Sequence, residues 1–360
     1  MKHDDFRPVR FLPAAVLALG LVLAGPALAC LVCIPLPQRT LADRVVEDAV
    51  LALARPAPDD PFRYVAKEYL RGGTDAPRDV TAPIPFLVDS AARRRIEADP
   101  GVFALVSRAT PDTDWELLGV MSPEMVVLVR DIVERSQTWA DHAASADRFA
   151  YFAARHASPD PAIRTLALAE ISGFPYARIR TLTPQLARAE IVRVLRDPTM
   201  FEWAPIHILI LGLSPADEDR AFVRSAFDAA ARSPSATSLG AWATAYLEGD
   251  GAAALDRIEA EFIDDPDRPK EQMAEILRAL STFAAVSEPA LRDRITGLFG
   301  ALATRRPDLA ADAAQELGNV GDWSFAGLFE ALLAEGAFRS PVEEFAIIFY
   351  IEQARDAGAL

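Results

Sequence analysis

The chain has 360 residues, of which 51% are hydrophobic and 25% are charged, and its formal net charge at pH 7 is −15. This composition is typical of a folded protein with a sizeable core and excludes an intrinsically disordered chain. The acidic excess repels phosphate backbones, so we expect no nucleic-acid partner. The length suggests two domains, or one domain and a repeat array.

The first 29 residues have the three parts of a signal peptide, namely a basic start, an apolar run and a small-x-small cleavage site. In order, these are Lys2, Arg7 and Arg10; residues 11–23; and Ala27 with Ala29. The apolar run is shorter and more interrupted than a membrane-spanning helix usually needs. We therefore expect cleavage after Ala29, and a mature protein that begins at Cys30 in the periplasm or outside the cell.

Cys30 and Cys33 are the two cysteines of the chain, and several fates are open to them. In an oxidising compartment a disulfide between them would fix the N-terminus locally. The alternative is lipidation of Cys30, although Ala27 and Leu28 depart from the usual lipoprotein signal; only then would the protein be attached to a membrane. A thiol redox pair is a third interpretation. Two cysteines do not supply the four ligands of a zinc site, so we expect no metal there.

Two pairs of strand-like segments predict hairpins within residues 30–121. The first pair is 49–54 with 62–70, and the second is 102–107 with 115–120, each joined by a turn-rich stretch. A further apolar segment lies at 86–88. Four or five short strands in this part of the chain predict a small β-barrel-like domain.

From Ser122 to the C-terminus the pattern is helical, so we expect successive helices over residues 122–360. Several helix starts combine a Ser, Thr or Asp N-cap with proline at the first helical position. They are Ser122–Pro123, Asp160–Pro161, Thr183–Pro184, Ser214–Pro215 and Ser340–Pro341.

Two helical segments resemble HEAT-type repeats. Residues 308–335 contain one helix, a break at Gly318 and Asn319, and a second helix, while residues 160–174 match the first half of such a unit. The resemblance implies an α-solenoid, in which stacked two-helix units bury a continuous core. A compact helical bundle is the alternative.

The N-terminal part has its own resemblance. The cysteine pair and the hairpin AVLALARPAPDDPFRYVAKEYLRGG at 49–73 are similar to the netrin-like OB domain of tissue inhibitors of metalloproteinases, although the later cysteines of that family are absent. A small β-domain before helical repeats also resembles a group of uncharacterised secreted bacterial proteins. These resemblances imply a mainly α chain, with an OB-type β-domain at 30–121 followed by a HEAT-like α-solenoid at 122–360.

The sequence contains no recognisable catalytic pattern. His142, His156 and His207 lie outside metal-binding spacings, and neither a nucleophile elbow nor a phosphate-binding loop is present. Phe201 and Trp203 are the candidates for an exposed aromatic edge that binds a partner.

We therefore expect a non-enzymatic binding or scaffold protein without a cofactor, whose helical surface binds a protein or peptide. A thiol redox protein that uses Cys30 and Cys33 is one alternative. A protease inhibitor that acts through the mature N-terminus is the other.

Overall fold

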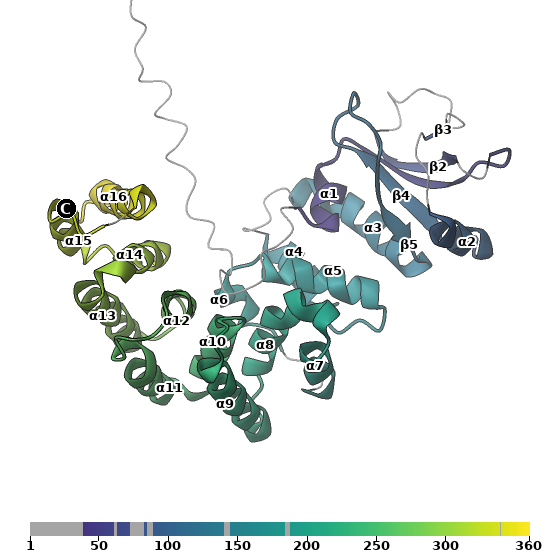
Figure 1. The fold of residues 1–360 in the computed structure, drawn as a ribbon. Helices are drawn as coiled ribbons and strands as arrows, with labels where there is room; N and C mark the ends of the chain where they lie inside the picture. The colour runs from purple at the N-terminus through teal and green to yellow at the C-terminus, as the bar shows by residue number, and fades with distance from the viewer. Residues whose placement is uncertain are drawn as a thin grey trace, which may run out of the picture.

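A computed structural model describes residues 39–60, 63–72, 83–84, 89–139, 145–183, 188–338 and 340–360. The predicted signal peptide, the cysteine pair, His142 and the apolar segment at 86–88 lie outside these residues. The described chain is mainly helical, with one small antiparallel sheet near its start (Figure 1).

The sheet has the strand order β3-β2-β1-β4-β5, and every neighbouring pair is antiparallel. Its strands are β1 (Val50–Pro56), β2 (Tyr64–Arg71), β3 (Pro83–Ile84), β4 (Phe103–Arg108) and β5 (Glu116–Met121). Both predicted hairpins are confirmed, since β1 pairs with β2 and β4 with β5. Among the described residues β3 and β5 are the two edge strands, since β3 pairs only with β2 and β5 only with β4. The described sheet is therefore open, whereas the sequence predicted a barrel.

Both faces of the central strand β1 are covered. Leu51 and Leu53 belong to the main core together with helices, including α1 (Leu41–Glu47) and α3 (Pro123–Arg135). The alternating residues of β1 belong to a smaller core that includes Ile96 of α2 (Ser90–Ala98). Because successive strand side chains point to opposite faces, double coverage explains why this strand is an uninterrupted apolar run.

The helices from 122 onward confirm the helical prediction. After α3 they are α4 (Ala146–Ala153), α5 (Pro161–Ser172), α6 (Tyr176–Ile179), α7 (Arg188–Leu195), α8 (Ala204–Gly212), α9 (Asp217–Arg232), α10 (Leu239–Asp250), α11 (Ala252–Ile258), α12 (Lys270–Ala284), α13 (Pro289–Arg305), α14 (Ala310–Asn319), α15 (Ala326–Ala334) and α16 (Pro341–Asp356). A 3₁₀ turn, η3 (Pro198–Trp203), leads into α8.

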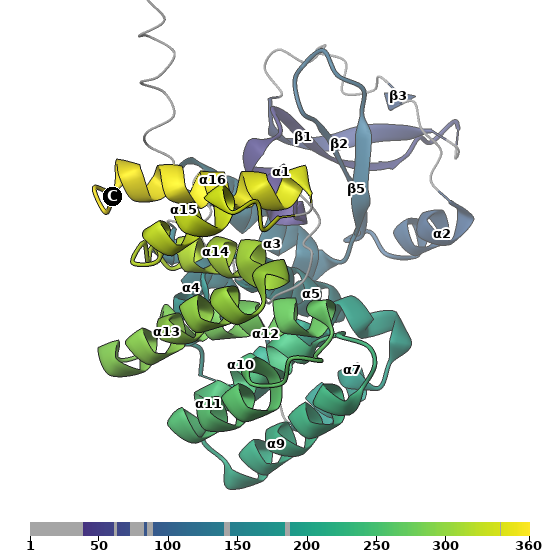
Figure 2. The ribbon, with the colours of Figure 1, turned by 60° about the vertical axis from the view of Figure 1, so that its left-hand side comes forward.

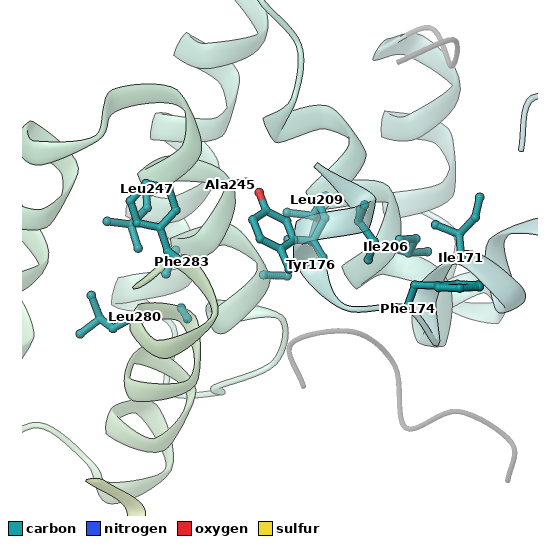
Figure 3. Packing of buried hydrophobic residues seen from close by; sticks show 14 of the residues in the cluster. Ile171, Phe174, Tyr176, Ile206, Leu209, Ala245, Leu247, Leu280 and Phe283 are labelled. Carbon is teal, nitrogen blue, oxygen red and sulfur yellow. The ribbon is translucent and has the colours of Figure 1, made fainter. Parts of the chain in front are cut away.

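The later helices form two layers that follow an arc (Figure 1). Helices α8, α10, α12, α14 and α16 contact one another in that order and make up the inner layer. Helices α9, α11, α13 and α15 lie outside them, and the two views agree on this arrangement (Figure 2). One core runs through the stack, from Ile171 and Phe174 near α5 to Leu280 and Phe283 of α12 (Figure 3).

Glycine allows two inner helices to approach closely. A Cβ atom on Gly212 of α8 would lie 2.7 Å from the Cβ of Ala245 on α10, which is closer than such atoms pack. A larger residue at this position would force the two helices apart. Small residues therefore set the spacing at this contact.

The two helices within the predicted repeat unit also contact helices outside it. Residues 308–335 do contain two helices, α14 and α15. In the structure, however, α14 contacts α13 and α16, while α15 contacts α16. The apolar face of α14 is shared with helices before and after it.

Three predicted helix starts are confirmed, because Ser122, Asp160 and Ser340 each accept a backbone N–H bond at the start of their helices. The prediction at Ser214 was wrong by two residues, since α9 begins at Asp217 with Ala216 as N-cap. The Ser214 hydroxyl instead donates to Asp219, 2.5 Å away, and forms a turn ahead of the helix. Residue 184 lies outside the described chain.

Candidate functional site: a groove between α14 and α16

A groove with a volume of about 570 Å³ lies between α14 and α16. Its wall on α16 is largely apolar, and its floor on α14 combines small residues with amides. The lining residues are Ala314, Gln315, Gly318 and Asn319 of α14, and Val342, Phe345, Ala346, Phe349, Tyr350 and Gln353 of α16. This combination can bury apolar side chains and also hydrogen-bond to a polypeptide.

Helix α16 carries four of the eight exposed large apolar side chains of the described residues. Val342 is 78% exposed, Phe345 68%, Phe349 54% and Ile348 43%. The rings of Phe345 and Phe349 are nearly parallel, with centroids 6.3 Å apart. The opposite side of the helix is buried as well, through residues that include Ile347. A helix that is apolar all round is usually buried, so the exposed side indicates a surface for a partner.

A buried carboxylate supports the floor of the groove. Glu316 of α14 is 5% exposed and accepts hydrogen bonds from the Ser281 hydroxyl at 2.5 Å and from Nδ2 of Asn319 at 3.2 Å. Burial raises the pKa of Glu316, although these hydrogen bonds and the nearby Arg278 act in the opposite direction. The network fixes the amide of Asn319 at the rim of the groove.

A lysine joins the start of α16 to the helices beneath it. Nζ of Lys270 donates to the carbonyl of Asp308 at 2.8 Å and to Oε1 of Glu343 at 3.0 Å, and it lies 3.6 Å from Oδ2 of Asp312. These residues come from α12, the turn before α14, α14 itself and α16. The ion pairs hold the groove wall in place relative to its floor.

A second polar cluster lies where the sheet meets the helices. Arg148 of α4 is 1% exposed and donates to Glu170 of α5 at 2.8 Å and to Asp43 of α1 at 2.5 Å. The Thr40 hydroxyl donates to the other oxygen of Glu170. These bonds satisfy the buried charges with one another and attach α1 to α4 and α5, so we assign the cluster a structural role.

The two residues of the predicted aromatic edge, Phe201 and Trp203, lie in different environments. Phe201 is 58% exposed, whereas Trp203 is partly buried and packs against the main core. The carbonyl of Trp203 lies 2.7 Å from Nδ1 of His207, which is buried. Burial lowers the pKa of His207, so the ring favours its neutral form. His156 is also buried, with Nδ1 2.6 Å from the carbonyl of Ala153.

Neither Phe201 nor Trp203 lines the α14–α16 groove, which the sequence analysis did not identify. A signal was present, because Val342, Phe345 and Phe349 recur at helical spacing on the side of α16 opposite its buried residues. Only the positions of α14 and α15 show which of the two apolar sides is exposed.

The cysteines Cys30 and Cys33 and the predicted cleavage-site residues Ala27 and Ala29 lie outside the described residues. Within the described chain, acidic, histidine and cysteine side chains form no group of three that could hold a metal ion. A search of the same residues finds no helix with the length and hydropathy needed to cross a membrane. Comparisons with known proteins found no matching family model, curated protein or solved structure.

Proposed function

We propose that the protein is a non-enzymatic binding or scaffold protein, and that its helical array binds a protein segment. The groove between α14 and α16 carries this proposal, because its wall exposes Val342, Phe345 and Phe349 to solvent. Apolar anchors surrounded by a few hydrogen-bonding groups are typical of protein interfaces. The amides of Gln315, Asn319 and Gln353 could bond to the backbone or side chains of the bound segment.

The order of helix contacts supports a HEAT-like solenoid as the architecture behind this surface. Each inner helix contacts the inner helix before it, and an outer helix lies between successive members. Such stacking leaves one extended face of the array available for binding.

The strand order supports an OB-type module before the solenoid. An OB fold is a partly open five-stranded barrel with a helix between its third and fourth strands. The order β3-β2-β1-β4-β5 and the position of α2 correspond to this arrangement, without the pairing of β3 with β5 that would close it.

We also propose that residues 1–29 direct export and that the protein works in the periplasm or outside the cell. The basic start, apolar run and cleavage site support this location. Intact mass spectrometry of the protein recovered from its host tests it. Cleavage after Ala29 is expected, and the mass also shows whether Cys30 is acylated or two hydrogens are lost in a disulfide.

Site-specific photo-crosslinking tests binding in the groove. A photoreactive residue at Gln315 of the full-length protein should trap a defined partner in extract from the compartment that holds it. The same residue at Asp217, which is highly exposed on α9, serves as the control. Trapping at 315 should be lost in Phe345→Asp and absent at 217. Identical products at both positions, or products unaffected by Phe345→Asp, would contradict the proposal.

A further inference from the structure

One side of α16 has no inner helix beside it, whereas α10, α12 and α14 each lie between two inner helices. Helix α10 contacts α8 and α12, and α12 in turn contacts α14. Helix α16 contacts α14 and α15, but no described residue covers the side that carries Phe345 and Phe349. The wall of the groove therefore presents an apolar surface on which another helix can pack.

The groove contains both large and small residues, so it is complementary to itself. Phe345 and Phe349 project from α16 beside Ala314 and Gly318 on the floor. A Cβ atom on Gly318 would have its nearest neighbour at 3.6 Å, so packing within the chain does not require glycine there. The missing side chain leaves only a methyl-sized space in the floor, and the groove itself, with a volume of about 570 Å³, supplies the room for an aromatic ring. A surface that holds both projecting rings and the space for them can pack against its own copy around a twofold axis.

An antiparallel pair of α16 helices also matches the charges at the helix ends. Glu343 and Glu344 lie in the first turn, and Arg355 lies in the last. When Phe345 of one copy lies opposite Phe349 of the other, each acidic first turn faces the last turn of its partner. This brings Glu344 toward Arg355 of the second copy, which also pairs with Glu330 and Glu352 of its own chain, so the antiparallel helix dipoles supply most of the attraction between the ends.

The exposed area is sufficient for a weak dimer. The four exposed side chains on α16 leave roughly 400 Å² of apolar surface in water, since a large aromatic side chain alone covers about 150–250 Å². Two copies and their flanking polar residues would bury about 1,000 Å², the lower end of specific interfaces. A dissociation constant in the micromolar range is therefore expected.

We propose that the groove binds α16 of a second copy of this chain, giving a twofold dimer with α14 and α16 of both copies at its centre. This inference rests on the proposed function, because it names the partner of the same groove. The two acidic chains repel each other, each with a formal charge of −15 for its full length. Salt screens that repulsion but does not weaken apolar burial, so the dimer becomes tighter as ionic strength rises.

Sedimentation of the purified mature protein tests the proposal, over concentrations from about 1 µM to about 100 µM. The wild type should change from monomer to dimer across this range, and more readily at about 300 mM salt than at about 50 mM. Phe345→Asp and Phe349→Asp should each raise the dissociation constant at least about tenfold. Phe201→Asp is the matched control, since Phe201 is similarly exposed but lies outside the groove, and it should dimerise like the wild type.

Cross-linking tests the twofold geometry. Ile348 lies close to the proposed axis, so Ile348→Cys in a background with Cys30 and Cys33 changed to Ser should form dimers with a short bis-maleimide. Asp217→Cys in the same background should not. A wild type that stays monomeric, a dimer insensitive to both Phe→Asp changes, or equal cross-linking at both positions would overturn the dimer. If the wild type is monomeric but a photoreactive residue at 315 traps another protein, the dimer fails and the proposed function stands.

Discussion

Arg148 is a buried charged side chain, so neighbouring residues supply the interactions that stabilise its guanidinium. Its guanidinium lies between the carboxylates of Glu170 and Asp43, and Nη1 is 3.4 Å from the carbonyl of Trp139. Glu170 is 0% exposed and has the Thr40 hydroxyl on its other oxygen. Removing one partner from such a pair leaves a buried charge without compensation, which costs more than the pair itself contributes.

We therefore predict that Arg148→Met lowers the free energy of unfolding by about 3–5 kcal/mol. The control is Arg305→Met, which breaks the exposed ion pair with Asp264 and should cost less than about 1 kcal/mol. Denaturant unfolding at neutral pH measures both. Equal small losses would show that water or a rearranged side chain compensates Glu170.

Glu316 gives a prediction with a defined dependence on pH. Burial raises its pKa in the folded protein, so the folded state holds its proton at pH values where the unfolded state has released it. Stability from this group is fully present below the unfolded pKa and is lost as pH rises through the folded pKa. Glu316→Gln, which keeps an acceptor for Ser281, should therefore stabilise the protein more at pH 8 than at pH 4.5.

Denaturant unfolding of wild type and Glu316→Gln at both pH values measures this difference. Taking the difference between the two proteins cancels titration elsewhere in the chain. A larger gain at the acid pH would show that the hydrogen bonds from Ser281 and Asn319, together with Arg278, outweigh burial.

A hydrogen bond between their capping residues links the N-termini of α3 and α5. Asp160 caps α5 by accepting from Ala162 N at 2.7 Å, and its other oxygen accepts from the hydroxyl of Ser122 at 3.2 Å. That hydroxyl in turn caps α3 by accepting from Met125 N at 3.2 Å. The hydrogen bond between Ser122 and Asp160 therefore holds the two capping side chains in position relative to each other.

We predict that Ser122→Ala and Asp160→Ala each cost about 1 kcal/mol of stability. The double variant should lose less than the sum, with a coupling of at least about 0.5 kcal/mol, because either change alone already removes the bond between the caps. A double-mutant cycle by denaturant unfolding measures this coupling. Strict additivity would mean that the two caps act independently.

Long or strongly patterned elements were predictable from the sequence, and short ones were not. The β1–β2 and β4–β5 hairpins and the Pro-capped starts of α3, α5 and α16 follow from local rules. Helices α1 and α2 were missed because helices of seven and nine residues are unstable alone. Tertiary contacts stabilise them, through Val45 in one and Ile96 in the other. The groove was missed for a related reason, since it exists only where α14 and α16 meet.

At the scale of the whole molecule, the sheet and the helices share a core. Leu51, Leu53 and Leu105 of the sheet belong to the same cluster as Val129 of α3 and Ile171 of α5. The bonds of Arg148 cross the same boundary. The sequence predicted a domain boundary after residue 121, and both apolar and polar contacts cross this position.

We predict that the sheet and the first helices open as one unit. In native-state hydrogen exchange, amides of β1 and α5 should show the same opening free energy, because neither can open without exposing the shared core. Arg148→Met should lower both by the same amount. Within the described chain, helices α15 and α16 form no ion pair with Arg148, Glu170 or Asp43. Their amides should therefore keep the same protection from hydrogen exchange in the variant, which provides an internal control. If protection falls in α5 but not in β1, the sheet is an independent domain that only rests against the array.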